Sequence, residues 1–166
     1  MIEQLSSPIT RHLDECQIHY EWMEIPLDPD KKPVRSLEDM LLSIGQDPGR
    51  IVRSLLFRTG SGDFVLLAVA GGGRADWGVL RKQLNERRLT MAEADEVLAA
   101  TGFPIGAVPP IALPENVRVL IDEGLFTYER VVIGSGILGQ ALDINSTDLR
   151  RGLSNAAVIG RFIKTE

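Results

Sequence analysis

A chain of 166 residues is long enough to bury a core in one domain without disulfides or metals, and we expect a single domain over residues 1–166. Hydrophobic residues make up 44% and charged residues 25%, which excludes a disordered chain and a coiled coil. The single cysteine, Cys16, excludes an internal disulfide. With no secretory leader and no apolar run of about 20 residues, the sequence predicts a cytoplasmic protein without a membrane segment.

The net charge of −5 argues against a protein that grips nucleic acid by broad phosphate neutralisation. The charge is uneven, however. Five basic residues between Arg74 and Arg88 outnumber two acids, whereas Arg118 alone offsets seven acids between Thr90 and Glu129. The basic stretch is consistent with a solvated helix face or with a weak RNA-facing patch.

The first half of the chain predicts helix, strand, helix and hairpin in that order. Ser7-Pro8 marks a helix start, and a strand is expected over residues 18–25. A loop is expected from Pro26 to Pro33. Ser36 with Asp39 resembles a capping box, which predicts a helix over residues 36–45. Two apolar runs separated by Gly60-Ser61-Gly62-Asp63 predict a β-hairpin from Ile51 to Ala70.

The second half predicts two helices followed by strands. One helix starts at Asp76, and a capping box of Thr90 with Glu93 starts another that ends near Gly102. That second helix is expected to direct Ala94, Val97 and Leu98 inward. Residues 101–114 hold four prolines and two glycines among apolar side chains, which favours an ordered loop packed on the body. The remaining expected elements are strands over residues 117–122, 130–133 and 140–144 and a short helix over residues 146–152.

The motif GSGILG at residues 134–139 matches the pattern of a dinucleotide-binding loop directly after a strand. No long helix follows it, so a tight loop between two strands is the better interpretation. The two histidines, His12 and His19, have no partners at metal-ligand spacing, and no metal or cofactor is expected. Ser54 and Ser135 could act as nucleophiles, but neither lies in a nucleophile elbow or has an evident base.

Arg53 stands out because strand alternation places it on the same face as Ile51, Leu55 and Phe57. Two interpretations stay open: an ion pair with a carboxylate such as Asp122, or a cation that lines a ligand pocket. The segment Gly106 to Pro110 could supply a second wall, since glycine allows close backbone approach and proline holds a loop rigid.

The order of these features resembles the YbaK / prolyl-tRNA synthetase editing-domain family of aminoacyl-tRNA deacylases over residues 36–153. The similarity rests on RSLLFR from Arg53, RADWGVLRKQL from Arg74, the loop GAVPP from Gly106 with its G-x-x-x-P pattern, IALP, VLIDEGL and the GSG turn at residues 134–136. It implies an α/β domain with a mixed, barrel-like β-sheet flanked by helices.

The resemblance also implies site residues. Arg53 would stand where the family has a functional lysine and would hold a phosphate or the ester carbonyl. Gly106 and Pro110 would position the aminoacyl group, and Gly134, Ser135 and Gly136 would form another wall. Arginine keeps a permanent charge and a bidentate grip on phosphate, but it cannot act as a general base.

By this resemblance the chain is expected to be a freestanding deacylase that acts in trans on the 3′ end of a mischarged tRNA, with Ala- or Cys-tRNA(Pro) as leading substrates. A synthetase or an elongation factor is the expected source of that tRNA, and no membrane partner is expected. The change from lysine to Arg53 motivates the alternative of an inactive module that binds aminoacyl-tRNA or a nucleotide. The sequence leaves the oligomeric state open.

Overall fold

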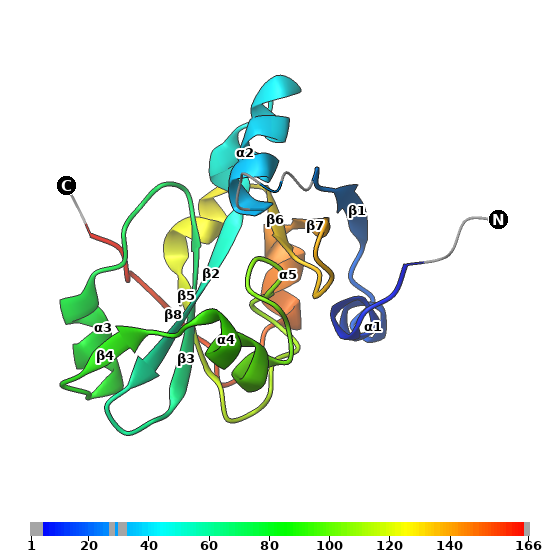
Figure 1. Ribbon diagram of the computed structural model, residues 1–166. Helices are drawn as coiled ribbons and strands as arrows, with labels where there is room; N and C mark the ends of the chain where they lie inside the picture. Colours follow the sequence, from blue (N-terminus) through cyan, green and yellow to red (C-terminus); the bar gives the residue numbers. More distant parts are fainter. Residues whose placement is uncertain (1–4, 27–28, 30–32, 165–166) are drawn as a thin grey trace.

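Two β-sheets form the framework of the computed structural model, which describes residues 5–26, 29 and 33–164 (Figure 1). Within these residues the smaller sheet has the order β1-β7-β6 and the larger sheet the order β4-β2-β3-β5-β8. The smaller sheet consists of β1 (Tyr20–Glu24), β6 (Arg130–Gly134) and β7 (Gln140–Asn145). The larger sheet consists of β2 (Val52–Thr59), β3 (Phe64–Ala70), β4 (Leu89–Met91), β5 (Arg118–Asp122) and β8 (Val158–Gly160).

The expected mixed α/β domain is confirmed, but the strands described by the structure form no closed barrel. A parallel bridge between Ile51 and Val132 links the backbones of the two sheets, and side chains of both sheets pack in one core. β4 pairs with residues 57–59 of β2 alone, so the first half of β2 remains an open sheet edge. The short partner strand is the physical reason why the sheet does not close.

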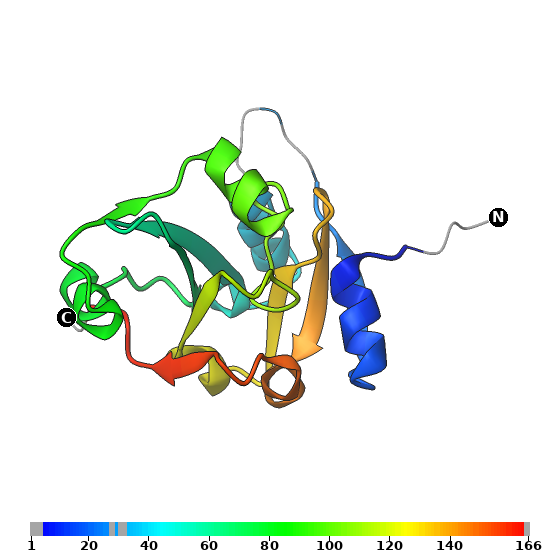
Figure 2. The same ribbon diagram turned by 90° about the horizontal axis from the view of Figure 1, so that it is seen from below.

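Helices cover the outer faces of both sheets. They are α1 (Pro8–Glu15), α2 (Pro33–Ser43), α3 (Trp77–Leu84), α4 (Ala94–Thr101) and α5 (Ser146–Gly152), together with the 3-10 helices η1 (Pro48–Arg50) and η2 (Glu123–Thr127). Figures 1 and 2 show α1 and α3 at opposite ends of the molecule. The larger sheet packs on α3 through Phe57, Leu80 and Leu84, and its other face joins α1 in the main core.

Local sequence signals explain several of these elements. Ser7 caps α1 as expected, and its hydroxyl accepts a hydrogen bond from the Thr10 amide. Asp76 caps α3 in the same way. The predicted hairpin is confirmed, since β2 and β3 pair antiparallel from Val52 with Ala70 to Arg58 with Phe64.

Other expectations were wrong in detail. α2 begins at Pro33, so Ser36 lies inside the helix instead of capping it. Thr90 pairs in β4, and Glu93 becomes the N-cap of α4. Leu98 is 52% exposed because it lies about 100° around the helix from the buried Val97.

Ala94 is likewise exposed, against expectation. The strand β8, which extends the larger sheet beside β5, was not anticipated at all. The loop expected between Pro26 and Pro33 falls mostly outside the described residues.

Candidate functional site

A cavity of about 530 Å³ lies beside the open edge of β2. Its walls are Ile51 and residues 52–56 of β2, Met91 at the end of β4 with Ala92 after it, Val97 of α4, the loop around Gly106, and the adjoining ends of β6 and β7. Ile25 and Leu37 close it on the side of α2. Most of this lining is apolar, so the few polar groups decide what can bind.

Ser54 presents polar groups to this cavity. The carbonyl oxygen of Leu56 points away from β3, because it accepts a hydrogen bond from the Ala92 amide at 2.9 Å. In a strand every second residue directs its amide and carbonyl to the same edge, so those of Ser54 also point to the open edge. Its hydroxyl oxygen is buried and has no hydrogen-bond partner in the described structure.

Arg53 lies at the junction of two cavities. It lines the larger one and also a second cavity of about 280 Å³, bounded by Glu38, η1 and the loop Gly71–Gly72. Its Nη2 donates to the carbonyl oxygens of Gly71 at 3.3 Å and Gly73 at 2.6 Å. These bonds fix one side of the guanidinium, so its other N–H groups can meet an anion or a carbonyl oxygen.

The alternative ion pair between Arg53 and Asp122 is wrong. Asp122 is 1% exposed, and its carboxylate accepts hydrogen bonds from the amides of Phe162 at 2.8 Å and Gly124 at 3.0 Å. It therefore holds the C-terminal segment against the end of β5. Arg53 faces the glycine loop instead.

The loop Gly106–Pro110 and the GSG turn are in direct contact. The Gly136 amide donates to the carbonyl oxygen of Ala107 at 2.8 Å. A Cβ on Gly134 would lie 2.6 Å from that same carbonyl group, so only glycine permits this approach. The turn joins β6 to the antiparallel β7, which confirms the predicted tight loop between strands.

The structure brings only some of the expected site residues to the cavity. Gly106 and Gly134 line it together with Arg53, whereas Pro110, Ser135 and Gly136 are not among its lining residues. The Ser135 hydroxyl is fully buried and donates to the carbonyl oxygen of Gln140 at 2.7 Å. It shapes the turn and is not directed at a ligand.

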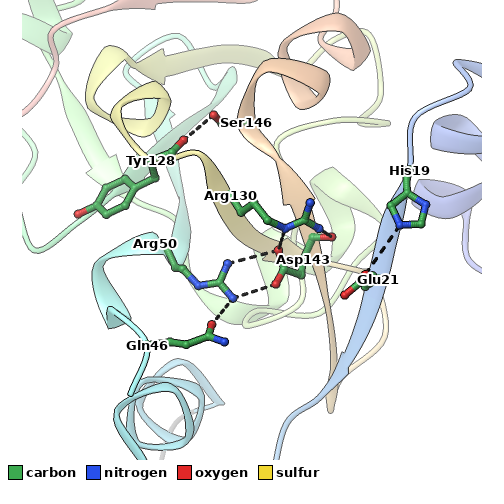
Figure 3. Close-up of polar contacts among 8 residues, drawn as sticks. All are labelled: His19, Glu21, Gln46, Arg50, Tyr128, Arg130, Asp143 and Ser146. Carbon is green, nitrogen blue, oxygen red and sulfur yellow. Dashed lines mark hydrogen bonds and ion pairs between the residues drawn. The ribbon is translucent and has the colours of Figure 1, made fainter. Parts of the chain in front are cut away.

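An ion-pair cluster supports one end of the site (Figure 3). Asp143 of β7 accepts hydrogen bonds from Arg50 Nη2 and Arg130 Nε, each at 2.8 Å, and Arg50 also donates to Gln46 at 2.6 Å. Burial raises the pKa of the Asp143 carboxyl, but the hydrogen bonds and charges of the two arginines outweigh it, so the pKa lies below its usual value. The cluster ties η1, just before β2, to the smaller sheet.

Other reactive side chains do not converge on the cavity. His12 Nε2 lies 2.8 Å from the carbonyl oxygen of Gly152 and 3.9 Å from Cys16 Sγ, so the pair links α1 to α5. In the described part of the chain no three His, Cys, Asp or Glu side chains cluster as a metal site would require. Across the same residues, no helix has the length and apolarity to cross a bilayer.

Sequence reasoning missed the loop Gly71–Gly73, which anchors Arg53. Three consecutive glycines directly after an apolar strand were the available signal, since glycine leaves backbone carbonyls open to a neighbouring side chain. Gln140, which lines the cavity from the start of β7, was also missed. No pattern in the sequence around Gln140 indicates a site residue.

The fold and the site together define a class of protein: an α/β domain with an apolar cavity, a rigid glycine-proline wall and an arginine at its rim, suited to a small ligand or to the end of a larger one. The chain belongs to the aminoacyl-tRNA editing domain family, whose model matches residues 31–151. This membership confirms the family resemblance inferred from the motifs.

Two curated relatives illustrate the match. The chain is 35% identical over 115 residues to the proline–tRNA ligase of Pseudothermotoga lettingae. These aligned residues are 69% of this chain and 20% of the ligase. It is 32% identical over 114 residues to the uncharacterized protein YwhH of Bacillus subtilis, covering 69% of this chain and 72% of YwhH. The chain thus spans about a fifth of the length of its ligase relatives.

Two solved structures share the fold. Hypothetical protein APE2540 superposes with a TM-score of 0.80 at 20% identity, covering 95% of this chain and all of that one. A candidate trans-editing enzyme for prolyl tRNA synthetase superposes with a TM-score of 0.78 at 24% identity, covering 98% of this chain and all of that one.

Proposed function

We propose that the protein is a freestanding aminoacyl-tRNA deacylase that acts in trans on a mischarged tRNA, with Ala- or Cys-tRNA(Pro) as the leading substrates. The observation behind this is the position of Arg53, held by two glycine carbonyls at the rim of an apolar cavity. Family membership supports the reaction class, and the ligase relatives support the connection with proline.

In this proposal the aminoacyl group enters the cavity and the terminal adenosine stays near Arg53. The free N–H groups of the guanidinium stabilise a nearby phosphate or the negative charge that develops on the ester carbonyl oxygen. A water molecule attacks that carbonyl carbon, the bond to the ribose oxygen breaks, and the products are the free amino acid and uncharged tRNA.

The proton of the attacking water needs an acceptor. No carboxylate, imidazole, thiol or amine lies among the described residues that line the larger cavity. The Arg53 guanidinium carries only N–H donors and no acceptor, so it cannot serve. Within the larger cavity the proposed acceptors are therefore the substrate's own groups or bulk water, with Arg53 in an electrostatic role.

Discrimination by size fits the construction of the cavity wall. A synthetase pocket separates amino acids that differ by one methylene by only about 1–3 kcal/mol, so a second pocket with unyielding walls is useful. Here Gly106 and Gly134 line the cavity, and the contact of Gly136 with Ala107 holds their two loops together. Delivery of the tRNA by a synthetase or an elongation factor in the cytoplasm completes the proposal.

The test is hydrolysis of a panel of charged tRNAs by the purified protein: Ala-, Cys-, Ser- and Pro-tRNA(Pro). Hydrolysis of one mischarged species, with Pro-tRNA(Pro) spared, would support editing and name the amino acid. The rival function is a binding module, motivated by Arg53 in place of the family's lysine. Binding of a non-hydrolysable aminoacyl-adenosine without turnover of any charged tRNA would favour that rival.

A further inference from the structure

A group of basic side chains covers α3 and the segments on either side of it. We define the α3 basic surface as Arg74, Arg81, Lys82, Arg87 and Arg88. Arg81 is half-buried and the other four are exposed. This density of positive charge contrasts with the net charge of −5 for the whole chain.

None of these five cations forms an ion pair with a carboxylate in the described part of the chain. Arginines elsewhere do form such pairs: Arg50, Arg58, Arg130, Arg151 and Arg161. The two acids inside the basic stretch have other partners, because Asp76 accepts from the Val79 amide and Glu86 accepts from the Ser61 hydroxyl. The five cations outnumber these two acids, so the stretch from Arg74 to Arg88 keeps a positive net charge (five cations against two acids).

The surface starts next to the candidate site. Arg53 and Phe57 lie on the same face of β2, and Phe57 packs edge-on against Trp77 of α3 with ring centroids 5.0 Å apart. Gly73, whose carbonyl oxygen anchors Arg53, directly precedes Arg74. From there α3 extends for eight residues, about 12 Å, away from the glycine loop.

We propose that the α3 basic surface binds the phosphates of the double-helical stem that leads to the tRNA 3′ end. This inference rests on the proposed function, because the 3′ end must enter the cavity beside Arg53. Arginine grips phosphate oxygens in pairs, and the unpaired side chains gain contacts without breaking existing ones. The acidic side chains elsewhere on the chain repel RNA phosphates, which disfavours RNA binding at other faces and so orients the RNA.

The test variant combines Arg81→Gln, Lys82→Gln, Arg87→Gln and Arg88→Gln, none of which lines either cavity. Arg11→Gln is the control, since it removes an exposed charge from α1 at the opposite end of the molecule (Figure 2). Dissociation constants for uncharged tRNA are measured from 50 to 200 mM salt. The slope of the log association constant against log salt concentration should be smaller in magnitude by about 3 to 4 in the fourfold variant than in the wild-type protein. The slope should be almost unchanged in the control. An unaltered slope in the fourfold variant would overturn the proposal.

A second measurement separates stem binding from damage to the site. For an amino acid that the wild-type protein removes, kcat/KM is compared on full tRNA and on the aminoacyl CCA trinucleotide, which has no stem. The fourfold variant should lose about tenfold or more on tRNA and keep the wild-type value on the trinucleotide. Equal losses on both substrates would contradict the proposal. If the wild-type protein hydrolyses neither, the proposed function fails, while the salt slopes still decide whether RNA binds here.

Discussion

Replacing Gly134 by alanine tests the close contact between the GSG turn and the glycine-proline loop. The new Cβ would lie 2.6 Å from the carbonyl carbon and oxygen of Ala107 and 2.7 Å from the carbonyl oxygen of Val108. All three atoms belong to the backbone, so the loop must retreat by several tenths of an ångström. Overpacking of this kind costs about 1–3 kcal/mol. At about 2–4 °C per kcal/mol for a chain of this length, Tm should fall by about 2–12 °C.

The assay is thermal and urea unfolding, combined with the Kd for a non-hydrolysable aminoacyl-adenosine. Ligand binding should weaken, because Gly106 and Gly134 both line the cavity that the displaced loop borders. Gly72→Ala is the matched control for stability, since its Cβ would meet nothing within 4 Å and its φ is not positive. A Gly134→Ala variant with wild-type Tm and wild-type ligand affinity would refute the reasoning.

Three further substitutions probe the framework. Asp143→Asn should destabilise the protein at pH 7 by about 1.5–3 kcal/mol in urea unfolding, whereas Asp148→Asn, which removes a surface ion pair, should cost about 0.5 kcal/mol. Folding lowers the pKa of Asp143, so its contribution to the free energy of unfolding is fully present above the unfolded pKa of about 3.9 and is lost as pH falls through the folded value. The difference in stability between the wild-type protein and Asp143→Asn should therefore shrink below about pH 4. A difference that grows there would contradict the direction of the pKa shift. Asp122→Ala should lower the unfolding free energy by at least about 2 kcal/mol, since two amides lose their acceptor, and a wild-type urea midpoint would contradict this. Gly78→Ala in α3 should raise the free energy of unfolding by up to about 1 kcal/mol through helix propensity, and so raise Tm slightly. A fall in Tm would contradict this.

Sequence patterns predicted the elements whose signals are local. The cap at Ser7, the hairpin from Ile51 to Ala70 and the tight GSG turn each depend on residues a few positions apart, and the structure contains all three. β8 was missed because it spans three residues and forms only by parallel pairing with β5, far away in the sequence. The cap at Thr90 was wrong because pairing with β2 uses that residue instead.

The candidate site was predictable in part for the same reason. Strand alternation predicted that Arg53 shares a face with Leu55 and Phe57, and glycine and proline content indicated a rigid loop at Gly106. The partner of Arg53 could not be predicted, because Gly71 and Gly73 reach it only through the folded end of β3. Nor could sequence alone distinguish Gly134, which lines the cavity, from Gly136, which does not.

The most direct measurement of the central proposal is single-turnover hydrolysis of a mischarged tRNA(Pro) by the wild-type protein and by Arg53→Ala. Arg58→Ala on the same strand serves as the control, because Arg58 is exposed, pairs with Glu96 and lines neither cavity. We expect hydrolysis by the wild-type protein, a loss of about 100-fold or more in Arg53→Ala, and little change in Arg58→Ala. Hydrolysis that survives unchanged in Arg53→Ala would contradict the role assigned to Arg53, and absence of hydrolysis by the wild-type protein on every charged tRNA would contradict the enzyme itself.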